Sequence, residues 1–327
     1  MKVGIIGCGI VGAYLAWKLA EGNEVHLFEE KAKIGSKACS GLISERLWDF
    51  VPKNDKVIKH MIGRCRINFP RKKVHLYFKP SMMVVDRNML TRYVAWLAHK
   101  AGAKLFVGHK ARKIFFNGGH KPQVSFDTPE GIKAFEFDKI IGCDGALSFV
   151  RKEVSGKDPK FRLGIYSYKK GKNHKRTVET FPTKNGFSWS IPRGDSIEVG
   201  TMEVNGTARG EFNRIRKRYK LPKKTKKFSS LIPVGIVALE SKDVAVCGDA
   251  MGLTKPWSGG GVIWGLTAAD IMAKSFPDFK SYNRRIRRKF APQLLMGRMA
   301  NRFVNAAGNH APWVLPNEIR YDSDWIG

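Results

Sequence analysis

Three glycines near the N-terminus have the spacing of a loop that binds a phosphate group. Gly7, Gly9 and Gly12 follow an apolar stretch and open a helical pattern. Glycines permit a tight turn and let the backbone approach a pyrophosphate, whose charge then lies at the N-terminus of the following helix. A second apolar stretch ends at Glu29, where a carboxylate can accept hydrogen bonds from a ribose. The pattern predicts a βαβ unit that binds a dinucleotide.

The acid at the ribose has two candidates, Glu29 and Glu30. We prefer Glu29, because the alternation of Val25, Leu27 and Glu29 places it on the strand face that leads into the site. The residues of this unit that we expect at the cofactor are Gly7, Gly9, Ile10, Val11, Gly12, Glu29 and Glu30.

Two further turns that contain glycine each follow a buried strand pattern. The first is Asp144-Gly145, and the second is Gly248-Asp249, which a run of three glycines at 259–261 follows. Asp144 either contacts the cofactor or bonds local backbone as a turn residue, and both interpretations stay open.

In this order, the three motifs resemble those of the FAD-dependent family that contains aromatic hydroxylases, flavin halogenases and geranylgeranyl reductases. The resemblance covers residues 1 to about 290. It implies that FAD is the cofactor, that Asp249 contacts its ribityl and pyrophosphate part, and that the glycine run opens a helix facing the flavin. A positive helix end there would stabilise negative charge on reduced flavin. The other residues that the resemblance places at the cofactor are Arg87, Val107, Asp144, Gly145, Gly248, Gly259, Gly260, Gly261 and Val262.

The segment at 181–192 resembles the substrate strand of the geranylgeranyl reductase branch, with a proline, then aromatic-x-Trp-x-apolar-Pro. Alternation places Phe187, Trp189 and Ile191 on one strand face, where they would line a pocket for an isoprenoid chain together with Pro256. Ordinary core packing is the alternative.

A short Cys-x-Gly stretch, Cys39-Ser40-Gly41, resembles one that lies close to the flavin ring in the same branch. The resemblance therefore adds these three residues to the cofactor site. Cys39 would shape the pocket or assist proton delivery, and an inert buried thiol is the alternative.

Two features depart from the reductase pattern. Phe187 stands where that motif usually has a tyrosine, so a hydroxyl group is missing at this position. Ile191-Pro192 is equally similar to the Trp-x-Ile-Pro signature of flavin halogenases, which are generally longer and need a dedicated lysine. The choice between the two branches stays open on this segment alone.

The periodicities predict a mixed α/β fold (α+β in part) with a Rossmann-like FAD-binding domain, an antiparallel-sheet substrate domain and a C-terminal helical region. We expect the FAD-binding domain to comprise 1–75, 76–155 and 236–275. The substrate domain is expected at 156–235, and a basic helical region at 276–327.

The formal net charge is +31, from 59 Lys and Arg against 28 Asp and Glu. Much of the surplus lies in two runs, at 214–227 and 280–289. An apolar residue recurs every four positions through and beyond the second run, which predicts a helix with an apolar stripe. That helix either lies on an anionic membrane surface or packs on its own domain with a solvated basic face. The stripe consists of Tyr282, Ile286, Phe290 and Leu294.

Composition excludes several classes of protein. Five cysteines at scattered spacings fit neither a disulfide framework nor a zinc site, so no metal is expected. No apolar run approaches the roughly 18 residues of a transmembrane helix, and the N-terminus does not resemble a secretion signal. Nucleic-acid binding is disfavoured, because no recognition motif accompanies the charge. We expect a cytoplasmic protein, with peripheral association with the inner membrane face as an option.

The resemblance implies an FAD-dependent oxidoreductase that reduces carbon–carbon double bonds of prenyl chains, in isoprenoid or archaeal-type lipid metabolism. Its mechanism would be hydride transfer from reduced flavin N5, with Cys39, Phe187 and Trp189 as catalytic residues. The electron donor would be a nicotinamide, a ferredoxin or a similar carrier. The alternatives are a flavin-dependent monooxygenase or halogenase on the same fold, and a basic nucleic-acid or membrane-surface binding protein without turnover.

Overall fold

A parallel sheet of five strands forms one half of the molecule. The computed structural model describes residues 1–35, 38–116, 121–204 and 206–324. In sheet order the five strands are β16 (Val244–Val246), β10 (Lys139–Gly142), β1 (Lys2–Ile6), β2 (Glu24–Glu29) and β6 (Lys104–Val107). All neighbouring strands are parallel, so their carboxyl ends meet at one edge. In open parallel sheets this edge is where ligands bind.

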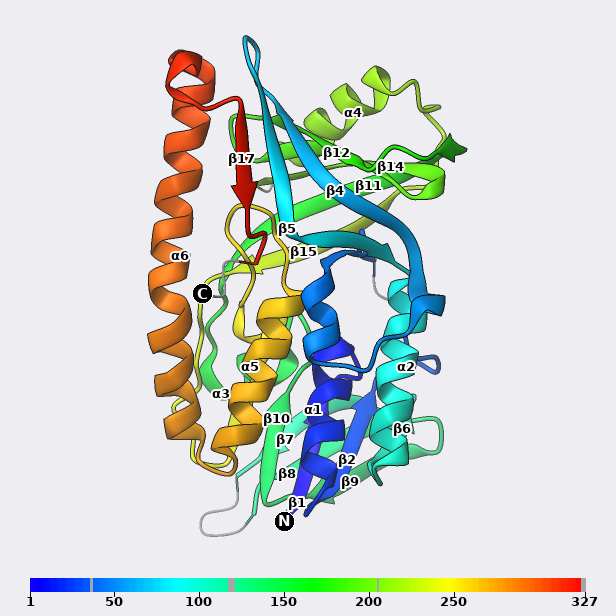
Figure 1. The fold of residues 1–327 in the computed structure, drawn as a ribbon. Coiled ribbons are helices and arrows are strands. Elements are labelled where there is room, and N and C mark those ends of the chain that lie inside the picture. Colours follow the sequence, from blue (N-terminus) through cyan, green and yellow to red (C-terminus); the bar gives the residue numbers. More distant parts are fainter. Residues whose placement is uncertain (36–37, 117–120, 205, 325–327) are drawn as a thin grey trace.

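Helices cover one face of the parallel sheet and a small antiparallel sheet covers the other. The helices, which lie side by side in Figure 1, are α1 (Ile10–Ala20), α2 (Arg87–Lys100) and α5 (Val262–Ser275). The small sheet consists of β7 (Lys110–Phe115), β8 (Gln123–Thr128) and β9 (Gly131–Glu136). Aromatic rings join the two sheets, since Phe28 stacks on Phe126 with ring centroids 4.2 Å apart. The short helix α3 (Phe149–Ser155) follows β10.

A second, larger sheet of nine strands forms the other half (Figure 1). Its strands, in order, are β15 (Phe228–Val234), β11 (Lys160–Asn173), β14 (Gly194–Val204), β13 (Phe187–Pro192), β12 (Thr177–Pro182), β4 (Ile58–Asn68), β5 (Lys73–Val85) and β17 (Glu318–Tyr321), with β3 (Leu42–Ser44) paired to β5. Most pairs are antiparallel, as the sequence predicts, but β12 with β4 and β17 with β5 are parallel. Helix α4 (Ala208–Arg218) packs on one face.

The predicted fold class is confirmed, and the proposed division into domains needs one amendment. Residues 58–85 form β4 and β5, which belong to the large sheet, although the sequence pattern assigns them to the FAD-binding domain. The reason is the non-local pairing of β4 with β12, more than 100 residues further along the chain. The remaining boundaries stay a proposal.

A long helix, α6 (Phe279–His310), runs along the side of the molecule and spans both halves (Figure 1). Its predicted apolar stripe is buried, with Tyr282, Ile286 and Phe290 at 0% exposure and Leu294 at 6%. This stripe packs on its own domain, so the membrane alternative does not apply to it. Among the described residues, no helix is both long and apolar enough to cross a membrane. Single turns of 3₁₀ helix lie at Glu45–Asp49, Asp55–Val57, Gly248–Met251 and Pro312–Val314.

Candidate cofactor and substrate site

The glycine loop between β1 and α1 shows why each of its three glycines is needed. A Cβ on Gly12 would lie 2.0 Å from the carbonyl oxygen of Gly7, so the third glycine permits the packing of helix on strand. Gly7 has φ of +102°, and a Cβ there would lie 2.5 Å from the Cys143 carbonyl oxygen. At Gly9, in contrast, no described atom lies within 4 Å of the added Cβ. The loop therefore leaves open space at its second glycine, where a pyrophosphate approaches the backbone in this type of motif.

The carboxylate of Glu29 lies against the same loop. Its Oε2 accepts a hydrogen bond from the Cys8 backbone N–H at 3.2 Å, and its Oε1 accepts one from Lys31 N–H at 3.1 Å. Glu30 is exposed to solvent. Val107 pairs with Glu29 in the register of β2 and β6, so it lies beside the predicted ribose site. Of the two candidate acids, Glu29 is the one that faces the loop.

The third motif packs on the start of α1 and on the start of α5. A Cβ on Gly248 would lie 3.1 Å from a methyl group of Val11. A Cβ on Gly261 would lie 2.7 Å from Asp249 Oδ1, which places this carboxylate at the N-terminus of α5. The N-cap residues of α1 and α5 are both glycines, Gly9 and Gly261, which have no side chain to cap the helix, and the N-terminus of a helix attracts a negatively charged group.

Two buried polar groups at this edge lack partners within the described residues. Nε and Nη1 of Arg87 are buried and make no hydrogen bond, and a Cβ on Gly41 would lie 3.5 Å from Cγ of the same side chain. Oδ2 of Asp144 accepts a hydrogen bond from Val150 N–H at 3.0 Å, while its Oδ1 is buried without a partner. Burial raises the pKa of Asp144. Unpaired buried groups of this kind cost free energy, and the phosphate and flavin oxygens of FAD would satisfy the guanidinium. The residues present therefore fit FAD.

The predicted substrate strand faces a row of side chains from two neighbouring strands. In register, β13 pairs Trp189 with Gly200 of β14, and β11 pairs Tyr166 with the same glycine. A Cβ on Gly200 would lie 2.5 Å from the Trp189 ring, so the missing side chain makes room for the indole. Phe187, Trp189 and Ile191 share one face and one apolar cluster, in which Trp189 is 9% exposed.

This apolar cluster contacts two segments predicted to hold the flavin. Ala38 and Leu42, which flank the Cys39-Ser40-Gly41 stretch, pack against it. Gly259 also lies close to it, because its added Cβ would lie 2.6 Å from the sulfur of Met202, a member of the cluster. Met202 pairs with Phe187 across β13 and β14. The structure thus brings the predicted cofactor residues and the predicted substrate face together.

Pro256 is the exception among the predicted pocket residues. It packs against α6, where a Cβ on Gly297 would lie 3.2 Å from its Cγ, and its carbonyl oxygen accepts a hydrogen bond from Arg162 at 2.9 Å. Through these contacts, Pro256 packs against α6 and positions it.

Two charged residues at the cluster are absent from the sequence prediction. Nε1 of Trp189 donates to Oε1 of Glu198 at 2.9 Å, and Nη1 of Arg193 donates to Oε2 of Glu198 at 3.2 Å. Arg193 also donates to the carbonyl oxygen of Ser40. The signal that could have found Glu198 is the alternation of β14, in which this glutamate shares a strand face with Gly200 and Met202.

Comparisons with known proteins show which proteins the chain is similar to. No protein-family model matches the chain. The geranylgeranyl diphosphate reductase of Rhodobacter capsulatus is 28% identical over 283 residues, which are 80% of this chain and 71% of that protein. A digeranylgeranylglycerophospholipid reductase of Methanosphaera stadtmanae is 23% identical over 84% of this chain and 75% of its own length. The chain spans 65% of the chloroplastic geranylgeranyl diphosphate reductase of Arabidopsis thaliana.

Solved structures share the fold. A geranylgeranyl bacteriochlorophyll reductase-like protein of Thermoplasma acidophilum has a TM-score of 0.82 at 18% identity and covers 93% of this chain and 87% of its own. The myxobacterial chondrochloren halogenase, an FAD-dependent halogenase, has a TM-score of 0.74 at 15% identity, with 90% and 81% covered.

The fold, the site and these similarities define the class of the protein, which is an oxidoreductase of the FAD-dependent flavoprotein type. Within this class, the predicted resemblance to the geranylgeranyl reductase family is confirmed.

Proposed function

We propose that the protein uses FAD to reduce carbon–carbon double bonds in the prenyl chain of a lipid, in isoprenoid or archaeal-type lipid metabolism. The observation that carries this proposal is the apolar sheet face of Phe187, Trp189 and Ile191, whose cluster contacts both segments predicted to hold the flavin. Relatives named as reductases of geranylgeranyl compounds supply the substrate class.

When bound in reduced form, the cofactor would supply a hydride, which carries the two electrons that the alkene gains. The glycine loop would bind its pyrophosphate, and Glu29 its ribose. Arg87 would bind an oxygen of the cofactor, because its buried Nε and Nη1 have no partner among the described residues. The apolar face would exclude water and hold the alkene in one orientation. Cys39, Phe187 and Trp189 remain our candidates for residues that touch the substrate.

The first prediction tests this function directly. Purified protein is expected to show the absorption spectrum of bound flavin, and the anaerobically reduced protein is expected to be reoxidised by a geranylgeranyl lipid. The matched control is the fully saturated lipid with the same headgroup, which should leave the flavin reduced. Protein without flavin, or reduced flavin that no prenyl lipid reoxidises, would contradict the proposal.

A flavin-dependent halogenase or monooxygenase is the second candidate, because the chondrochloren halogenase shares the fold. Rapid oxygen consumption stimulated by substrate would favour it. Flavin halogenases need a dedicated active-site lysine. Among the described residues, the buried lysine is Lys255, and it is already ion-paired with Asp324 at 3.0 Å. This pairing disfavours halogenation.

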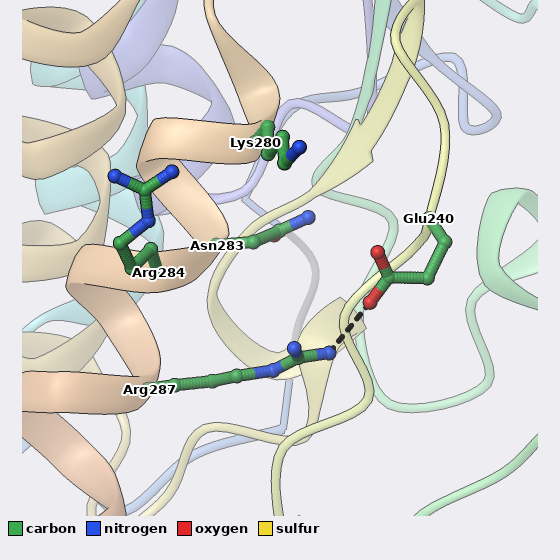
Figure 2. Close-up of a pocket in the computed structure, with 5 residues that line it drawn as sticks. All are labelled: Glu240, Lys280, Asn283, Arg284 and Arg287. Atoms are coloured by element: carbon green, nitrogen blue, oxygen red, sulfur yellow. Dashed lines mark hydrogen bonds and ion pairs between the residues drawn. The ribbon is translucent and has the colours of Figure 1, made fainter.

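We further propose that the protein works at an anionic membrane surface, through the outer side of α6. Basic side chains occupy the first half of this helix, and Figure 2 shows Lys280, Arg284 and Arg287 around a surface pocket in which Arg287 pairs with Glu240 at 2.7 Å. The second half exposes large apolar side chains, namely Leu295, Met296, Met299 and Phe303 at 53–61%.

No acidic residue occurs between Asp278 and Glu318, so α6 combines exposed apolar groups with basic side chains that no acid of the helix itself offsets. A second copy of the chain would bring like charges together on this face. An anionic lipid surface would satisfy both the apolar and the basic groups, and each basic residue near such a surface contributes about 1 kcal/mol.

The second prediction concerns this surface. Phe303→Asp is expected to weaken binding to vesicles of anionic phospholipid by roughly tenfold. The reason is that the variant loses about 1.5 kcal/mol of the free energy gained by burying the phenylalanine ring in the lipid. Ile132→Asp is the control, since Ile132 on β9 is 64% exposed and Phe303 is 60% exposed. Co-sedimentation measures both. Equal binding of the wild-type protein to neutral and anionic vesicles would rule the proposal out.

A further inference from the structure

The sheet face that carries Trp189 holds a buried carboxyl group that the sequence prediction does not include. Glu198 lies directly opposite Ile191 of β13 and opposite Tyr168 of β11 in the strand registers. Its exposed fraction is 0%. Glu203, also buried on β14, points to the other face and bonds to Thr183 at 2.5 Å. Among the described residues, Glu198 is the buried carboxyl group of the predicted substrate face.

Both oxygens of Glu198 are engaged by groups of the proposed site. Oε1 accepts the indole N–H of Trp189, and Oε2 accepts the guanidinium of Arg193, which also bonds to the carbonyl oxygen of Ser40. The carboxyl group therefore connects the tryptophan of the substrate strand with the stretch predicted to lie at the flavin ring.

Burial makes Glu198 a weaker acid than an ordinary carboxyl group. Desolvation raises its pKa to about 7, against the opposing effects of Arg193 and of hydrogen bonds from Trp189 and Tyr168. The other titratable groups that face the cluster are Tyr166 and Tyr168 of β11 and Cys39 of the neighbouring stretch. Burial raises the pKa of both tyrosines above their ordinary value of 10.0, so Glu198 is a far stronger acid than either phenol.

Reduction of an alkene needs a proton donor in a site that excludes water. The best donor has a pKa near the working pH, because it must be protonated and still release its proton readily. The sequence prediction leaves this role open to Cys39, but Glu198 is fully buried on the substrate face and hydrogen-bonded to Trp189. We propose that Glu198 is the acid that protonates the substrate alkene, a role that rests on the proposed reductase function.

The atoms and electrons of this step balance. The O–H bond of the Glu198 carboxylic acid breaks, and a C–H bond forms on one alkene carbon. The other alkene carbon receives the hydride, so the alkene gains two electrons and the reduced flavin loses them. The carboxylate that remains is paired with Arg193, and solvent returns the proton between turnovers past this side chain, which is 14% exposed.

The third prediction tests this role in the FAD-loaded protein under anaerobic conditions. Glu198→Gln is expected to slow reoxidation by a prenyl lipid in a single turnover by about 100-fold or more. The wild-type rate should fall as pH rises through about 7, where the donor loses its proton, and the variant should lose this pH dependence. Glu203→Gln is the matched control, because it removes a buried carboxyl group of the same strand on the opposite face, and it should keep the wild-type rate and pH profile.

A second readout needs neither flavin nor substrate. In flavin-free protein, infrared spectroscopy should show a protonated carboxyl band that disappears as pH rises through about 7. Glu203→Gln should retain the band, whereas Glu198→Gln should lack it. This measurement and the wild-type pH profile keep the test decisive if Glu198→Gln folds poorly.

The possible failures are distinguishable. A wild-type protein that binds FAD but reduces no prenyl lipid overturns the proposed function, and the acid role with it. An active enzyme in which Glu198→Gln keeps the wild-type rate, or in which no carboxyl band titrates near neutral pH, overturns the role of Glu198 alone.

Discussion

Replacing Gly9 by alanine is expected to abolish tight FAD binding while leaving the flavin-free protein as stable as the wild type. No described atom lies within 4 Å of the position of the added Cβ, and the φ of −73° at Gly9 suits alanine. The methyl group would occupy the open space at the start of α1, where we place the pyrophosphate. We expect Kd for FAD to rise by roughly 100-fold, or about 3 kcal/mol, in a fluorescence titration. The free energy of unfolding should change by no more than about 0.5 kcal/mol.

Two further glycines serve as controls for this experiment. Gly12→Ala should destabilise the fold itself, because its Cβ would lie 2.0 Å from the Gly7 carbonyl oxygen. Gly210→Ala, on α4, has no described atom within 4 Å of its Cβ and lies on another element, so it should leave FAD affinity unchanged and stabilise its helix by about 0.5–1 kcal/mol. Wild-type FAD affinity in Gly9→Ala would mean that the pyrophosphate does not lie at this loop.

The sequence is enough to place the predicted cofactor turns at one edge of the parallel sheet, because each of its parts is local. The glycines of 7–12, the acid at Glu29 and the turns after β10 and β16 each follow their own strand directly. Parallel strands present their carboxyl ends at the same edge, so recognising the strands is enough to bring these turns together. To place these turns together, it is not necessary to know how strands far apart in the sequence pair.

The substrate side depends on register, and the sequence prediction is correspondingly incomplete there. The contact of Glu198 with Trp189 requires the pairing of β13 with β14 across the turn at Arg193. A shift of one residue would send Glu198 to the opposite face. Gly200, which admits the indole ring, has no pattern of its own in the sequence.

The position of α6 shows a related limit. Its spacing of apolar residues identifies the side that packs inward, which includes Tyr282 and Phe290. The exposure of Met299 and Phe303 depends on which other elements reach the outer side, and a helical pattern does not contain that information. The residues that we place at the membrane are therefore different from those of the predicted stripe.

Replacing Arg151 by methionine is expected to lower the free energy of unfolding by about 3–5 kcal/mol. The guanidinium is 0% exposed and donates to the carbonyl oxygens of Ala250 at 2.6 Å and Ala146 at 3.0 Å. It also pairs with Asp158. Methionine has no donors, so the buried carbonyl oxygen of Ala250 would lose its partner, and the carbonyl oxygen of Ala146 and the Asp158 carboxylate would lose theirs to Arg151. Denaturant unfolding of the flavin-free protein measures the loss.

The neighbouring residue provides a matched control, because Lys152 pairs with the same carboxylate, Asp158, at 3.4 Å but is 50% exposed. Lys152→Met should cost less than about 1 kcal/mol, as expected for a surface ion pair. If the two variants were equally stable, the hydrogen bonds of Arg151 would not be what holds the Asp144 turn and the Asp249 turn together. Because Arg151 joins these two turns at the cofactor edge, its loss should also weaken FAD binding, whereas the loss of Lys152 should not. A stability loss without any change in FAD affinity would show that the two turns keep their positions independently of each other.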